Sequence, residues 1–308
     1  MNESLELQLS ALAKSVLRLR TPSFSAPSQT NCFWWIFEQN GEMDKVRDLT
    51  DVAYANGSRT RVRAGGYREA SQCDIAVITA GSKFSYGQPS LDYLYPNTAI
   101  LRSIVNEMEP FRSDIILLIV ANPVDLLTSL AKELSGLPSS QVLGSGTFLE
   151  TVRLRGLLAD KAGIAQNSID LYVLGVHGDA KVAVWSSATI GGVPLEKALS
   201  SGVVAKESLA RECRQRSRSI FSTKGAMPLG IGSIVTSICT SILQDKRDVR
   251  PISHFQPEFG CCFSLPAVLR RSGIIQELPA PMETKEHEAL VESARTLKRT
   301  LDRVQEQY

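Results

Sequence analysis

Several features that mark particular classes of protein are missing from this sequence of 308 residues. Its best apolar run, Ile115–Val120, is far shorter than the ~18–20 residues of a membrane-spanning helix. Lysine plus arginine (34) exceeds aspartate plus glutamate (32) by only two, so the charge favours neither nucleic acid nor an anionic membrane as a partner. The composition also excludes collagen, coiled-coil and disordered proteins.

The cysteines exclude two further kinds of site. None of the six belongs to a CxxC pair, and the adjacent Cys261 and Cys262 match neither a zinc site nor a disulfide framework. We therefore expect no bound metal and reduced thiols, as in a cytoplasmic protein.

Short β-rich runs alternate with helical stretches from residue 32 onward, which predicts an α/β fold with a parallel sheet. Ligands bind such sheets at the carboxyl ends of the strands, where Gly81 and Asn122 stand here. The first half is expected to hold strands at 32–37, 74–81 and 114–120, and helices at 44–55, 98–109 and 124–135.

The pattern changes after about residue 141. Strands are expected at 171–175 and 181–190, a turn at 191–194, and helices at 203–222 and 283–307. We predict a dinucleotide-type domain at 32–141 and a substrate domain at 142–308.

Residues 1–31 show the pattern of neither predicted domain. Apolar residues recur at helical spacing from Leu5 to Leu19, and a stretch rich in serine and proline follows. A transit peptide would carry few acidic residues, and Glu3 and Glu6 count against one. The pattern predicts a docking helix and a linker.

Of the three histidines, one is placed for chemistry. His287 lies among charged residues on a predicted helix, so a position in solvent explains it. His254 lies in an apolar run, so a packing role explains it. His177 stands between Gly175 and Gly178, and glycines allow a tight turn that exposes the ring at the end of a strand. Catalysis and a structural turn both fit this spacing.

Glu150 and Arg153 lie three residues apart at the start of a predicted helix. A surface ion pair is one interpretation. The other gives each charge a separate task, since a carboxylate can orient a histidine and a guanidinium can hold a substrate carboxylate in a two-pronged contact.

These motifs together resemble the L-lactate/malate dehydrogenase family, on the lactate side. The resemblance rests on VANPVD at 120–125, GSGT-L-x-x-x-R at 144–153, GxHGD at 175–179 and Trp185-Ser186, in the family's order and spacing, and extends from about residue 44 to the C-terminus. It implies an incomplete doubly wound (Rossmann-like) parallel sheet followed by an α+β substrate domain.

The resemblance also implies a reaction and its residues. The reaction is hydride transfer between NADH and a 2-oxo monocarboxylic acid such as pyruvate. His177 would be the acid/base, Glu150 its orienting carboxylate and Arg153 the clamp on the substrate carboxylate, with Asn122 touching both substrate and nicotinamide. The remaining family positions are Phe84 and Lys83 toward the substrate, and Glu38, Thr79, Ala80, Gly81, Val120 and Thr147 toward NAD.

Several positions depart from the family's pattern. The GxGxxG turn after the first strand, whose backbone N–H groups approach a pyrophosphate, is absent. Ser90 stands where the family has an arginine that polarises the carbonyl, and loss of one such donor costs ~10²–10³ in rate. Glu150 replaces an aspartate, and Met227 replaces a threonine.

Three alternatives follow from these departures and from the charges. The chain can be an impaired family member that serves as a non-enzymatic oligomer subunit, or a malate-type dehydrogenase. Phe84 disfavours the latter, because a second substrate charge would lack a partner. Nucleic-acid binding through the arginines at 211–218 is the third, although a solvated helix face explains them. The family implies a homodimer or homotetramer, and we expect neither nucleic acid nor a membrane as a partner.

Overall fold

The computed structural model describes residues 16–19, 33–34, 42–55, 61–82, 90–199 and 205–307. Glu38, Lys83 and Phe84, which the resemblance places at the cofactor and substrate, lie outside these residues.

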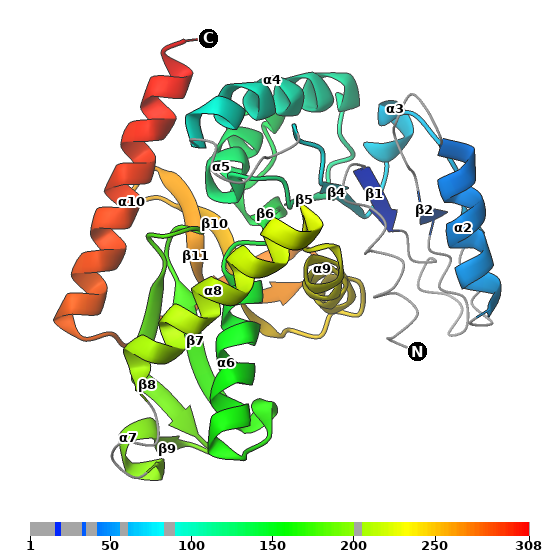
Figure 1. Cartoon of the computed structure of the whole chain (residues 1–308). Coiled ribbons are helices and arrows are strands. Elements are labelled where there is room, and N and C mark those ends of the chain that lie inside the picture. The colour runs from blue at the N-terminus through cyan, green and yellow to red at the C-terminus, as the bar shows by residue number, and fades with distance from the viewer. Residues whose placement is uncertain are drawn as a thin grey trace.

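A seven-stranded mixed sheet forms the centre of the molecule (Figure 1). Its order is β1-β4-β5-β6-β10-β11-β12. The strands are β1 (Val16–Leu19), β4 (Ile75–Ile78), β5 (Ile116–Ile119), β6 (Val142–Gly144), β10 (Val249–Gln256), β11 (Cys261–Arg270) and β12 (Gly273–Glu277). β4, β5 and β6 are mutually parallel, as predicted, and the other pairings are antiparallel.

Helices cover both faces of this sheet, which explains why the central strands are apolar throughout. Ala76 and Ile78 of β4 pack with α4 (Ser90–Met108), α5 (Val124–Ser135) and α10 (Thr284–Gln305). Ile75 and Val77 point the other way and pack with α9 (Pro228–Leu243) and with Leu49 of α2 (Glu42–Ala55). All four β4 side chains are at most 1% exposed.

A second sheet supports the other half of the molecule. It contains β7 (Ile169–Leu174), β8 (Val182–Ile190) and β9 (Val193–Pro194). The helices α6 (Phe148–Ala162), α7 (Leu195–Ala198) and α8 (Lys206–Lys224) pack against it. A backbone bridge between Gly175 and Ser264 links the end of β7 to the seven-stranded sheet.

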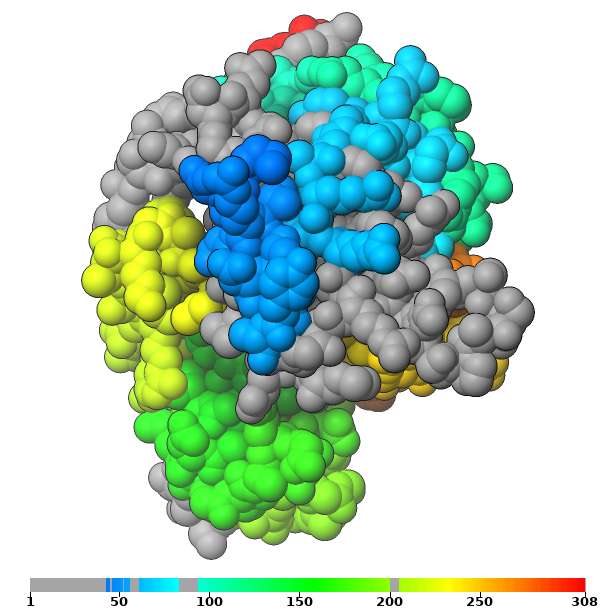
Figure 2. Space-filling view, turned by 90° about the vertical axis from the view of Figure 1, so that its right-hand side faces the viewer, coloured from blue at the N-terminus to red at the C-terminus, as the bar shows by residue number. Residues whose placement is uncertain are grey.

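The remaining elements lie beside β1. β2 (Phe33–Trp34) and β3 (Arg61–Val62) form a parallel pair, and α3 (Tyr67–Ala70) follows. Figure 2 shows α2 on the surface beside residues 61–82. The short helices η1 (Ser139–Gln141) and η2 (Gln166–Ser168) complete the elements.

Two expectations are corrected. Residues 16–19, assigned to a docking helix, form the strand β1, because the open hydrogen-bonding edge of β4 accepts an extended segment. The helix expected from residue 98 begins at Ser90 and contains Pro96. The turn expected at 191–194 is also corrected in part, because Val193–Pro194 form the strand β9. The helix at 124–135 has the expected bounds, and the other expected elements of the described residues are present with shifted ends. The domain boundary at 141/142 stays a prediction.

None of the described helices is by itself long and apolar enough to cross a membrane; the bent pair α8 and α9 passes that test only when taken together.

Candidate functional site

His177 lies in a tight turn after β7, where two glycines adopt positive φ angles. Gly175 has φ +84°, and Gly178 has φ +120°. The backbone N–H of His177 donates to Oδ2 of Asp125, at the start of α5, over 2.5 Å. The turn thus fixes the histidine between the two sheets.

Glu150, in the first turn of α6, faces the histidine ring. Its Oε1 lies 3.1 Å from Nδ1 of His177, and its side chain is only 6% exposed. Burial would raise the pKa of the Glu150 carboxyl, but the positive charges of His177 and Lys181 outweigh this and hold the pKa well below its usual range. Burial would likewise lower the pKa of His177, and the Glu150 carboxylate raises it instead. The pair therefore favours a carboxylate beside an imidazolium.

Arg153 points to a different part of the site. Its guanidinium donates to the hydroxyl of Ser217 on α8 and lies 3.5 Å from the sulfur of Met227, next to α9. Glu150 instead contacts His177 and Lys181. The structure thus gives the two charges separate partners, as the second interpretation of their spacing expects.

Asp125 is a buried carboxyl group beside the histidine that the sequence analysis missed. It is 2% exposed, and burial raises the pKa of its carboxyl to about 6. An acidic residue in the first turn of an otherwise buried helix is the signal that was available. Lys181 was also missed, although it is a cation directly before a strand.

The carboxyl ends of β4 and β5 form the edge expected to hold a cofactor. Thr79, Ala80, Gly81 and Val120 are partly exposed there, and Asn122 is exposed. Asn97 of α4 ties the edge together, because its side chain accepts from the N–H of Ser82 and donates to the carbonyl of Asn122, both over 2.6 Å.

Thr147, also expected toward the cofactor, is placed differently from these residues. It is fully buried, its hydroxyl donates to the carbonyl of Val173, and its N–H donates to the hydroxyl of Ser264. The hydroxyl of Thr147 therefore holds the start of α6 against β7, its N–H holds it against β11, and both donors are used within the protein.

The described residues fit one half of a nicotinamide dinucleotide. The exposed residue Asn122 and the glycine at 81 suit a planar pyridine ring that carries a carboxamide at this edge. The described residues do not fit the pyrophosphate half in this way, because β1 is antiparallel to β4. In this pairing Val16 lies beside Ile78 and Leu19 beside Ile75. The end of β1 thus lies at the opposite edge, and among the described residues no glycine turn follows a strand beside β4.

Comparisons with known proteins agree with this arrangement. The NAD-binding domain model of lactate/malate dehydrogenases matches residues 36–144, and the model of their α/β C-terminal domain matches residues 147–308.

Two curated relatives cover most of the chain. L-lactate dehydrogenase A of Rhizopus oryzae is 40% identical over 254 residues, which are 82% of this chain and 79% of that protein. L-lactate dehydrogenase of Deinococcus radiodurans is 33% identical over 285 residues, 90% and 93% of the two chains.

A solved structure shows the same likeness. The ligand-bound minor L-lactate dehydrogenase of Enterococcus mundtii superposes with a TM-score of 0.82 at 31% identity, covering 89% of this chain and 90% of that one. The chain therefore belongs to the lactate/malate dehydrogenase family and carries the family's NAD-binding and C-terminal domains in that order.

Proposed function

We propose that the protein is an NAD-dependent oxidoreductase of the lactate dehydrogenase type, which interconverts an L-2-hydroxy monocarboxylic acid and its 2-oxo acid. The observation that carries this proposal is the buried contact between Nδ1 of His177 and Oε1 of Glu150, at 3.1 Å, in a member of this family.

His177 is the proton donor and acceptor in this proposal. Because Nδ1 faces Glu150, Nε2 is the ring nitrogen that meets the substrate. In reduction, Nε2 gives its proton to the carbonyl oxygen, and in oxidation it takes the hydroxyl proton. Glu150 stabilises the imidazolium form electrostatically. NAD, when bound, supplies the hydride chemistry, and Thr79, Ala80, Gly81, Val120 and Asn122 are the described residues that would hold its nicotinamide end.

Arg153 is proposed to bind the substrate carboxylate. Its present partners are a neutral hydroxyl and a thioether, which is only a weak acceptor. A carboxylate offers two charged oxygens that match the guanidinium, so it replaces these partners at a gain in free energy.

We extend the proposal to six finer points. Lys83 and Phe84 contact the substrate, Phe84 favours a monocarboxylate over a dicarboxylate, and Glu38 lies toward the cofactor ribose. The chain divides into domains at 32–141 and 142–308, forms a homodimer or homotetramer, and works in the cytoplasm.

The test is oxidation of NADH by the purified protein with pyruvate, and separately with oxaloacetate, beside the variant His177→Ala. We expect turnover with pyruvate, less with oxaloacetate, and a loss of at least about 10²-fold in the variant, the contribution of one general acid. A folded wild type that is as inactive as the variant would refute the proposal.

The direction of β1 favours a second candidate, a family member that keeps the fold but binds the cofactor poorly. Calorimetry with NADH separates the two candidates. Saturable binding in the micromolar range supports the dehydrogenase, and no saturation up to millimolar NADH supports the non-enzymatic subunit.

A further inference from the structure

Lys181 is a largely buried basic residue that has no role in the function proposed above. It lies immediately before β8, and its side chain is 14% exposed. Its Nζ is 3.8 Å from Oε1 of Glu150. The same oxygen faces Nδ1 of His177 at 3.1 Å. One carboxylate oxygen therefore lies between two basic groups.

Lys181 also holds the turn that presents the histidine. Its Nζ donates to the carbonyl of Gly178 over 2.7 Å, and Gly178 has φ +120°. The N–H of His177 is fixed from the other side by Asp125. The backbone on each side of the ring is thus tied to a charged side chain.

The proton cycle explains why a second cation is useful here. A buried carboxylate is costly unless a positive charge accompanies it. His177 supplies that charge only while it is protonated, and it becomes neutral each time it gives its proton to a 2-oxo acid. Lys181 takes no part in that transfer, so Glu150 keeps a basic partner in both states of the histidine.

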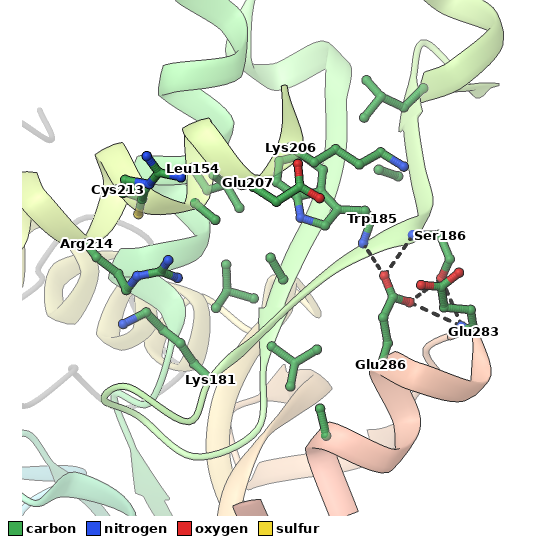
Figure 3. Close-up of a pocket in the computed structure, with 18 of the residues that line it drawn as sticks. Leu154, Lys181, Trp185, Ser186, Lys206, Glu207, Cys213, Arg214, Glu283 and Glu286 are labelled. Carbon is green, nitrogen blue, oxygen red and sulfur yellow. Dashed lines mark hydrogen bonds between the residues drawn. The ribbon is translucent and has the colours of Figure 1, made fainter. Parts of the chain in front are cut away.

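Other ionisable groups surround this centre. Asp125 from α5 and the Cys213 thiol from α8 interact with it electrostatically, Arg153 from α6 acts on the Cys213 thiol, and Arg214 from α8 lines the same cavity as Lys181. Asp179, in the turn itself, is exposed and pairs with Arg218 at 3.4 Å. Lys181, Cys213 and Arg214 line one end of a cavity of about 690 Å³, and Glu286 binds Trp185 and Ser186 at the other end (Figure 3). The carboxylate that Lys181 contacts is Glu150, at the catalytic pair.

We propose that Lys181 is a positioning residue for proton transfer: it keeps Glu150 anionic beside His177 and closes the turn that holds the imidazole. This proposal rests on the proposed function, because it assigns Lys181 a task within the same reaction.

The magnitude follows from Coulomb's law. Both nitrogens lie within 4 Å of the same oxygen, so Nζ of Lys181 and Nδ1 of His177 are less than about 7 Å apart. At an effective dielectric constant of about 20 to 40, removal of the Lys181 charge raises the pKa of His177 by about 1 to 2.

The experiment is a titration of the imidazole by NMR in protein labelled at histidine, which needs no enzymatic turnover. The chain has only three histidines, so a His177→Asn spectrum assigns the relevant signal. The variants are Lys181→Gln, which removes the charge and keeps a donor for the Gly178 carbonyl, Lys181→Met, which removes both, and Lys181→Arg, which keeps the charge. Melting temperatures confirm that each variant is folded.

We expect the pKa of His177 to rise in the Gln and Met variants and to stay within about 0.3 of wild type in the Arg variant. The alkaline limb of kcat/KM for pyruvate reduction should move by the same amount in Lys181→Gln. An unchanged pKa in a folded Gln variant would overturn the proposal, as would equal changes in the Gln and Arg variants.

The outcomes also separate this proposal from the proposed function. A raised pKa in a protein that does not oxidise NADH supports the Lys181 assignment and refutes the dehydrogenase. Normal turnover, together with an unchanged pKa of His177 in Lys181→Gln, supports the dehydrogenase and refutes the Lys181 assignment.

Discussion

Asp125 gives the most quantitative prediction, because a carboxyl group that is 2% exposed in the folded protein becomes solvated on unfolding. Burial raises its pKa from 3.8 to about 6, the Glu150 charge adds to this, and the contacts with His177 oppose it. Between these two values the folded state binds more protons than the unfolded state. The free energy of unfolding therefore falls as the pH rises from about 4 to about 6.

The substitution Asp125→Asn removes this dependence. Asparagine keeps an oxygen that accepts from the His177 N–H and cannot ionise. A difference of about 2 in pKa corresponds to about 3 kcal/mol. For a chain of this length, with ~2.1 cal/mol/K of unfolding entropy per residue, that free energy amounts to about 5 °C in Tm. We expect the Tm of the variant, relative to wild type, to increase by about 5 °C between pH 4 and pH 7.

Thermal unfolding across this pH range, followed by fluorescence, tests the prediction. Asp179→Asn is the matched control, since that side chain is 84% exposed and lies in the neighbouring turn. The relative Tm of the control should not change with pH. If the relative Tm of Asp125→Asn also stayed constant with pH, the pKa of Asp125 would not be raised, and the reasoning from burial would fail.

Two further predictions concern the substrate clamp and the backbone. Arg153→Lys loses the planar fork and should raise KM for pyruvate about 10–100-fold, while Arg155→Lys on the same helix leaves KM unchanged; equal KM values in both variants would remove Arg153 from the site. Gly273→Ala should lower Tm by several degrees more than Gly136→Ala. Both glycines have positive φ, but the added methyl group would lie 1.9 Å from the Ser140 carbonyl in the first and meets nothing within 4 Å in the second. A similar Tm in both would show that close packing at Gly273 is unimportant.

The central sheet could be predicted from the sequence because its strands are apolar on both faces. β4 and β5 are fully buried, and that pattern fits only a sheet covered on both sides. The start of α4 could not be predicted in the same way. Proline disfavours a helix interior, so Pro96 gives no local sign that the helix extends across it. Leu94 nevertheless packs into the same cluster as Leu101, and this burial outweighs the local penalty.

The segment 16–19 shows a different limit. Its apolar residues repeat at helical spacing, yet it pairs with β4. An unpaired strand edge recruits an extended segment through backbone hydrogen bonds, which do not depend on side-chain pattern. Nothing in the local sequence reports that the neighbouring edge is open.

The contact between His177 and Glu150 could be predicted, and the charges around it could not. His177 and Glu150 lie in motifs whose spacing carries the family resemblance, and the structure brings them to 3.1 Å. Asp125 reaches the same turn from a helix 52 residues earlier in the chain. Lys181 contacts Glu150 through a turn whose geometry depends on Gly178. Such contacts arise from the packing of elements and leave no periodic signal.

The pH dependence of kcat/KM for pyruvate reduction, in wild type and in Glu150→Gln, tests most directly whether His177 and Glu150 form a proton-transfer pair. Reduction needs the imidazolium, so kcat/KM should be constant at low pH and fall tenfold per pH unit above the pKa of His177. Loss of an opposite charge at 3.1 Å lowers that pKa by about 1 to 3. The fall of kcat/KM in the variant should therefore begin at a pH that is lower by the same amount. A limb at the same pH in both proteins would contradict the account.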